Sequence, residues 1–174
     1  GPAGSEVRSS GDLVAFFADF HFPTNNVTAA EHAADDTGPE HYYSFDHGDA
    51  HLVVLYAPLQ LGASVFQADS AQYRWLERDL AESAKPWKFL FLHLPLASSG
   101  PHGDDDYDGN LIPDAVELSG VLLPVARRHG VAVVFSAHDH IYERFLPVGG
   151  VHRIVSGGGG GSLYYPGLMA PGSV

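Results

Sequence analysis

The chain has 174 residues, 45% of them hydrophobic, which predicts one domain with a substantial core. It contains no cysteine, so disulfides, thiolate catalysis and cysteine-based zinc sites are excluded. Nine Lys and Arg residues against 21 Asp and Glu residues give a formal net charge of −12 with histidine neutral. An acidic surface repels nucleic acid and anionic membranes, and no apolar run approaches the ~20 residues of a membrane span, so neither partner is expected.

The first part of the chain predicts a lead, a loop and a hairpin. Residues 1–12 are polar and predict a flexible lead, without the basic and apolar regions of a signal peptide. Residues 24–41, which follow an aromatic-rich stretch, predict a polar loop. Two runs of strand-forming residues, 42–46 and 51–57, flank a short Gly-Asp turn and predict a β-hairpin.

The rest of the chain alternates helices and strands. Helices are expected over residues 69–83 and 115–129, the second interrupted or kinked near Pro124 and stopped by Gly130. The runs that predict further strands are 87–95, 131–137 and 152–157. This order indicates an α/β layer with a mixed sheet and flanking helices.

Histidines follow two of these predicted strands. His93 ends the run FLFLH, and His138 and His140 follow VVFSA. Functional groups collect beyond the carboxyl ends of strands in α/β sheets, and neutral imidazole is a good ligand for transition metals. Because the chain has 11 histidines, spacing alone leaves open both a metal site and ordinary strand-end histidines.

Five stretches of the chain, read in order, resemble the second half of calcineurin-like metallophosphoesterases of the purple acid phosphatase type. They are YYSFDHGDAHLVVL, QYRWLERDL, WKFLFLHLPLASSGPHG, VAVVFSAHDHIYERF and HRIVSGGGGGSLY. The most specific piece, AHDHIYER, is similar to the family's G-H-x-H-x-Y-E-R, with Ala137 where glycine is usual. His93 lies in His-Leu-Pro, where the family has His-x-Pro.

The resemblance implies a fold and a division of the chain. The fold would be half of an α-β-β-α sandwich, with residues 13–165 forming the C-terminal part of a catalytic domain. Residues 1–12 would be a flexible lead, and residues 166–174 a Pro/Gly-rich tail. The resemblance also favours an extracytoplasmic or secreted location.

The resemblance further implies a role for each histidine. His93 and His138 would bind one metal ion and His140 a second. His102 would contact the substrate phosphate or protonate the leaving group, although a solvated loop histidine is an equal alternative. The complete domain would hold two ions of iron, zinc or manganese ~3.5–4 Å apart and hydrolyse a small phosphoester.

Two further elements have implied structural roles. The family pattern suggests that Glu143 and Arg144 hold their loop through an ion pair. The run Gly157–Gly161 lacks the lysine of a phosphate-binding loop and does not open a helix. It therefore favours close backbone packing over nucleotide binding.

The family's N-terminal motifs, G-D-x-H, G-D-x-x-D/Y and G-N-H-D/E, have no convincing match in the chain. Gly48-Asp49-Ala50-His51 matches the first in letters but lies in the predicted hairpin, and Asp19-Phe20-His21 matches the family better elsewhere. Without the bridging aspartate, two cations would repel each other, so a dinuclear centre needs the missing N-terminal half. Two hypotheses follow: part of a phosphoester hydrolase, or a non-catalytic module that binds at most one metal ion through histidines.

Overall fold

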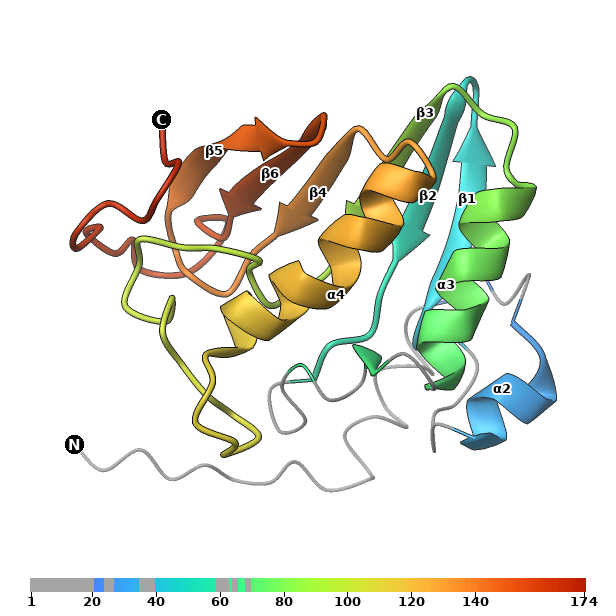
Figure 1. Cartoon of the computed structure of the whole chain (residues 1–174), viewed down its shortest axis with the longest axis horizontal. Coiled ribbons are helices and arrows are strands. Elements are labelled where there is room, and N and C mark those ends of the chain that lie inside the picture. The colour runs from blue at the N-terminus through green and yellow to red at the C-terminus, as the bar shows by residue number, and fades with distance from the viewer. Residues whose placement is uncertain (1–20, 24–26, 35–39, 59–62, 64–65, 68–69) are drawn as a thin grey trace.

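The computed structural model describes residues 21–23, 27–34, 40–58, 63, 66–67 and 70–174, which form a single mixed sheet with helices (Figure 1). The strands are β1 (Tyr43–His47), β2 (Ala50–Val54), β3 (Trp87–Phe91), β4 (Val133–Ser136), β5 (Tyr142–Val148) and β6 (Val151–Ser156). The helices are α2 (Ala29–Ala34), α3 (Ala71–Glu82) and α4 (Asp114–Arg128). The sheet order is β1-β2-β3-β4-β6-β5, with β2, β3, β4 and β6 parallel. The expected α/β fold is confirmed.

The two long helices form close to where their sequence signals predict. The Ser70 side chain caps α3 by accepting a hydrogen bond from the backbone N–H of Tyr73. Helix α4 ends before Gly130, whose φ of 70° suits a residue without a side chain. The expected interruption at Pro124 is wrong, because α4 continues through it. The residues on either side of Pro124 are buried in the core, and that packing offsets the lost backbone hydrogen bond.

Helices α3 and α4 lie on the same face of the sheet (Figure 1). The main core fills the space between these two helices and the sheet. Its fully buried members include Val53, Leu90 and Val134 from the strands and Trp75, Leu76, Leu80, Leu118 and Leu122 from the helices. None of the described helices is long and apolar enough to cross a membrane.

The opposite side of the sheet, here called the open sheet face, is apolar and is covered by no described helix (Figure 1). Its side chains are only partly buried and come from alternate residues of four strands: Leu52, Val54, Phe89, Phe91, Val133, Phe135 and Ile154. The rings of Phe91 and Phe135 stack on it with centroids 5.1 Å apart. One face covered by helices and an apolar face that none of the described helices covers are the arrangement expected of half a sandwich.

The structure contains two elements, α2 and β5, that the sequence did not lead us to expect. Part of the expected loop 24–41 is helix α2, where the Thr28 backbone N–H donates to Glu31 and the Glu31 N–H donates to the Thr28 hydroxyl. This is a capping box, a signal that residues 28 and 31 carry in the sequence. Strand β5 pairs antiparallel with β6 at the sheet edge, where Pro147 is tolerated because an edge strand needs fewer ladder hydrogen bonds.

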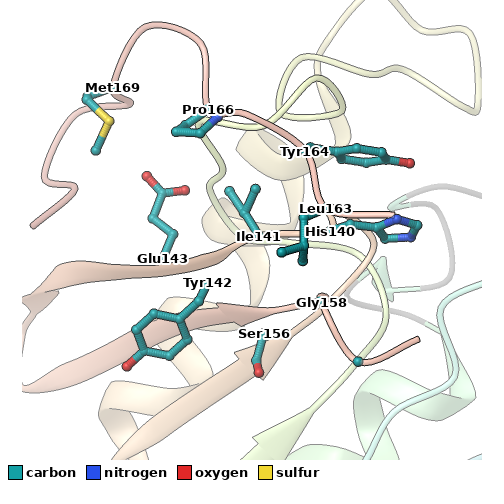
Figure 2. Close-up of a pocket in the computed structure, with 11 residues that line it drawn as sticks. His140, Ile141, Tyr142, Glu143, Ser156, Gly158, Leu163, Tyr164, Pro166 and Met169 are labelled. Carbon is teal, nitrogen blue, oxygen red and sulfur yellow. The ribbon is translucent and has the colours of Figure 1, made fainter. Parts of the chain in front are cut away.

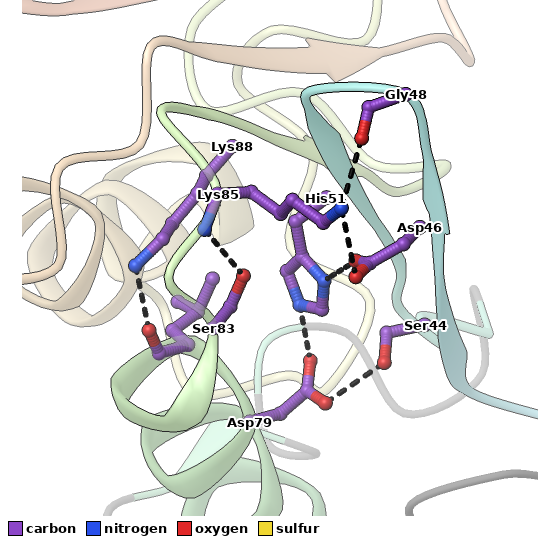
Figure 3. Close-up of polar contacts among 9 residues, drawn as sticks. Ser44, Asp46, Gly48, His51, Asp79, Ser83, Lys85 and Lys88 are labelled. Atoms are coloured by element: carbon purple, nitrogen blue, oxygen red, sulfur yellow. Dashed lines mark hydrogen bonds and ion pairs between the residues drawn. The ribbon is translucent and has the colours of Figure 1, made fainter.

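A buried polar cluster joins the β1–β2 hairpin to α3 (Figure 3). His51, only 4% exposed, contacts the carboxylates of Asp46 at 2.8 Å and Asp79 at 2.9 Å, and Ser44 donates to Asp79 at 2.8 Å. Burial alone would lower the pKa of His51, but the two carboxylates outweigh it and raise the pKa. His51 therefore links the hairpin to α3 through both of its ring nitrogens.

Candidate metal centre

The candidate centre lies beyond the carboxyl ends of β3 and β4, which are parallel neighbours. His93 and His138 each follow the last residue of their strand by two positions. The backbone N–H of Ala137 donates to the carbonyl of His93 at 3.0 Å, so the two segments stay side by side after the strands end. His51 lies opposite Lys88 near the start of β3, at the other end of the sheet. The G-D-x-H match is therefore remote from the centre.

His93 and His138 face each other directly. Their Nε2 and Nδ1 atoms lie 3.0 Å apart, and their ring centroids are separated by 4.9 Å. His138 has a φ of 66°, in the left-handed region that non-glycine residues rarely occupy and that is enriched at functional sites. Two ligands at right angles on ~2.1 Å bonds lie ~3.0 Å apart, so the pair fits as adjacent ligands of one ion.

His140 is held separately from that pair. Its Nδ1 lies 2.9 Å from the carbonyl of Ser162, and its ring stacks on Tyr164 with centroids 4.4 Å apart. A carbonyl only accepts hydrogen bonds, so Nδ1 carries the proton and Nε2 of the neutral ring is left for a metal. A backbone carbonyl in this position is the usual outer partner of a metal-binding histidine.

His102 lies on the loop after β3, beside His138. Its Nδ1 is 2.7 Å from Asp105, its backbone N–H donates to Asp139, and its ring centroid is 4.5 Å from that of His138. The Tyr107 hydroxyl bridges Asp105 at 2.6 Å and the Nε2 atom of His138 at 2.7 Å. Asp105 and Tyr107 are functional candidates that the sequence analysis missed, because nothing in DDDYDGN marks which acidic residue turns inward.

The site electrostatics favour neutral imidazoles. Burial, followed by the nearby charges of His93 and His102, lowers the pKa of His138 to about 4. Burial, followed by the charge of His140, also lowers the pKa of His93. Both shifts favour the neutral ring, which is the form that binds metal.

Glu143 holds the loop after β3 through hydrogen bonds and not through the expected ion pair. It is 6% exposed and accepts hydrogen bonds from the backbone N–H of Ser99 at 2.9 Å and from the hydroxyls of Ser99 and Ser173. Among the residues that the structure describes, no ion pair joins Glu143 to Arg144, so that prediction is wrong. Neighbours on a strand point to opposite faces, and Arg144 is exposed.

The glycine run packs against the centre. A Cβ atom added at Gly157 would lie 2.0 Å from the carbonyl oxygen of Asp139, and one at Gly161 would lie 2.3 Å from the His140 ring. Such distances are impossible, so only glycine lets this segment approach the His140 ring and the backbone of the loop that carries it. The expected close-packing role fits this geometry.

A cavity of about 400 Å³ opens beside His140 (Figure 2). Its lining is mainly apolar and comes largely from the start of β5, the residues just before it and the C-terminal segment, with Ile141, Tyr142, Leu163, Tyr164, Pro166 and Met169 among its members. The carboxylate of Glu143 lies at its wall.

Comparison with known proteins points to one family. The sequence model of the calcineurin-like phosphoesterase family matches residues 8–142. Purple acid phosphatase 22 of Arabidopsis thaliana is 35% identical over 129 residues, covering 68% of this chain and 27% of its own. Acid phosphatase type 7 of Mus musculus is 30% identical over 118 residues, covering 62% of this chain and 26% of its own. The chain thus spans about a quarter of the length of these relatives.

The fold has a counterpart among solved structures. A purple acid phosphatase from yellow lupin (Lupinus luteus) seeds superposes with a TM-score of 0.68 at 18% identity. The superposition covers 99% of this chain and 32% of the lupin chain. The family match over most of the chain and the shared fold lead to one conclusion: the chain belongs to the calcineurin-like phosphoesterase family, among relatives of the purple acid phosphatases.

Proposed function

We propose that this chain is the C-terminal part of the catalytic domain of a metal-dependent phosphoric ester hydrolase of the acid phosphatase type. The observation that supports it most is the pair of neutral imidazoles, His93 and His138, 3.0 Å apart at the ends of adjacent parallel strands. His140 lies close by with its Nδ1 proton committed to a carbonyl. The proposed substrate is a small phosphoester.

In this proposal the three histidines divide between two ions of iron, zinc or manganese. His93 and His138 would hold one ion, and the Nε2 atom of His140 would bind the other. Bound ions of this kind neutralise charge on a phosphoryl group and lower the pKa of water. The protein's own contribution is to fix each ring, through the backbone contact of His93 with Ala137 and the stacking of His140 on Tyr164.

His102 is the proposed proton donor to the leaving alkoxide. Asp105 holds its Nδ1 and Asp139 holds its backbone, so the other ring nitrogen, Nε2, is available to the substrate. The apolar cavity beside His140 would accept the organic part of the ester.

The open sheet face is the proposed docking surface for the N-terminal half of the same domain. Packed sheets bury facing side chains ~10 Å apart, and this face already presents two rows of apolar residues in register. That half would also bring the acidic residues needed to hold two cations together. An extracytoplasmic or secreted location is part of the proposal and would be tested by cell fractionation.

The test is hydrolysis of an aryl phosphate with Mn²⁺, Zn²⁺ or iron present. We expect the isolated chain to show little or no turnover, and the chain joined to the coding sequence that precedes it to be active. Robust turnover by the isolated chain would contradict the proposal that it is only part of the catalytic domain. An extended protein that folds and binds metal but hydrolyses no phosphoester would favour a non-catalytic, histidine-based metal-binding module.

A further inference from the structure

A second group of metal-binding atoms lies next to the proposed centre and shares only His138 with its proposed ligands. One donor atom each from His102, Asp105 and His138 lies within 4.8 Å of the other two, and all three side chains are partly buried. His93 and His140 do not belong to this group. Asp105 has no ligand role in the proposed phosphatase centre.

The geometry separates this group from the His93–His138 pair. His93 faces the Nδ1 atom of His138, whereas the Nε2 atom of His138 faces Tyr107 and Asp105. The Tyr107 hydroxyl contacts Asp105 and His138 at hydrogen-bond distance, which shows that a small group fits between the carboxylate and the imidazole. A bound ion would either displace this hydroxyl or bind beside it.

The loop that carries two of the three side chains is fastened to rigid elements. Asp114, 3% exposed at the start of α4, accepts from the backbone N–H of Tyr107 at 2.7 Å. The backbone N–H of Asp114 donates to the carbonyl of Asp105 at 2.9 Å. The Asp139 carboxylate holds the backbone of His102. The three donors are therefore positioned before any ion binds, which is what a metal site requires.

We propose that His102, Asp105 and His138 bind one zinc-like divalent ion. Two imidazoles and one carboxylate form a donor set used by zinc and iron, with remaining positions open to water, and it is poorly suited to magnesium or calcium. The site goes beyond the proposed hydrolase activity, since it exists whether or not the chain is catalytic. Because it shares His138 with the proposed centre, an ion here would compete with that centre for one imidazole, and it would also bind His102, the proposed proton donor.

The experiment is a zinc titration of the chain by isothermal titration calorimetry, paired with melting curves followed by circular dichroism with and without zinc. We compare Asp105→Asn with Asp104→Asn, which makes the same charge change at the exposed neighbouring residue. His93→Ala and His140→Ala test the competing ligand set. No hydrolysis is measured, so the result is independent of whether the chain belongs to a phosphatase.

We expect one zinc ion per chain and a rise in melting temperature with zinc. Changes in outer-shell partners alone cost about 10- to 100-fold in metal affinity, so loss of the Asp105 ligand should cost at least about 100-fold. Asp104→Asn, His93→Ala and His140→Ala should keep most of the affinity. If Asp105→Asn fails to fold, His102→Gln is judged by the same criterion.

Three results would overturn the site. They are no zinc binding by the unaltered chain, equal affinities of Asp105→Asn and Asp104→Asn, and loss of binding in His93→Ala comparable to that in Asp105→Asn. The last result would place the ion between His93 and His138 and would leave the proposed function standing.

Discussion

The Nε2 atom of His93 and the Nδ1 atom of His138 lie 3.0 Å apart, although 45 positions separate the two residues in the chain. The contact arises because β3 and β4 are parallel neighbours and each histidine follows its strand by the same number of residues. Burial lowers the pKa of both rings, so both are available as neutral ligands.

This pair gives the first prediction. In the extended, active protein, His93→Ala and His138→Ala should each reduce kcat for an aryl phosphate by at least about 100-fold, because each removes a metal ligand. His47→Ala is the control, since His47 is exposed at the far end of the β1–β2 hairpin. Metal content, measured with the rate, should fall in the two site variants and stay constant in His47→Ala. Full activity in both site variants would rule out the ligand assignment.

The second prediction uses neighbouring residues on opposite faces of β3. Leu90 is fully buried under the helices, so Leu90→Ala should cost about 2–5 kcal/mol in unfolding free energy of the isolated chain. Phe91 lies on the open sheet face, so Phe91→Ala should cost only about 1 kcal/mol there, mainly from its stacking on Phe135. Chemical denaturation measures both. Affinity for the N-terminal half should show the opposite order, with the larger loss in Phe91→Ala, because only that substitution changes the docking surface.

The same face predicts the physical state of the isolated chain. An apolar face that no described helix covers should bind a dye that reports exposed apolar surface and should make melting depend on protein concentration. Adding the N-terminal half should remove both effects. A chain that binds no dye and melts cooperatively as a monomer at high temperature would argue against the docking surface.

A third prediction concerns pH. His51 has a pKa raised above the ordinary 6.5, so its stabilising contacts are fully present below that value and are lost as pH rises through the raised pKa. Asp46 has a pKa lowered from 3.8, mainly by the hydrogen bond from His51, so its contribution is lost as pH falls below 3.8. Stability should therefore be highest between these limits.

The matching variant is His51→Gln. It removes the imidazole that contacts the buried carboxylate of Asp79 at 2.9 Å and should cost about 3 kcal/mol at pH 6. The melting temperature of the unaltered chain should be lower at alkaline pH than at pH 6. The difference in melting temperature between the unaltered chain and the variant should therefore be smaller at alkaline pH. An equal pH response of the two proteins would show that His51 does not carry the effect.

A fourth prediction tests the glycine run. Gly157→Ala places a Cβ 2.0 Å from the carbonyl oxygen of Asp139, and the displacement should cost about 1–3 kcal/mol. Gly159→Ala is its control, because a Cβ there meets nothing within 4 Å. Thermal unfolding should separate the two variants, and the first should also weaken zinc binding by moving the segment that carries His138. Equal melting temperatures would show that this backbone approach is not needed.

The sequence by itself determined most of the elements and the identity of the histidines. Period and capping residues place α3, the Gly130 signal ends α4, and apolar runs mark β3 and β4, since all of these depend on residues close together in the chain. The same kind of local signal, Thr28 with Glu31, was present for α2.

Only the tertiary structure decided which side chains meet. Nothing local distinguishes Asp105 from Asp104, and it is the tie between the Asp105–Tyr107 loop and α4 through Asp114 that turns Asp105 toward His138. In the same way Glu143 pairs with Ser99 and Ser173, far away in the chain, instead of with Arg144 beside it. Contacts of this kind depend on strand order and loop packing, which are settled by long-range hydrogen bonds and burial and not by the spacing of neighbouring residues.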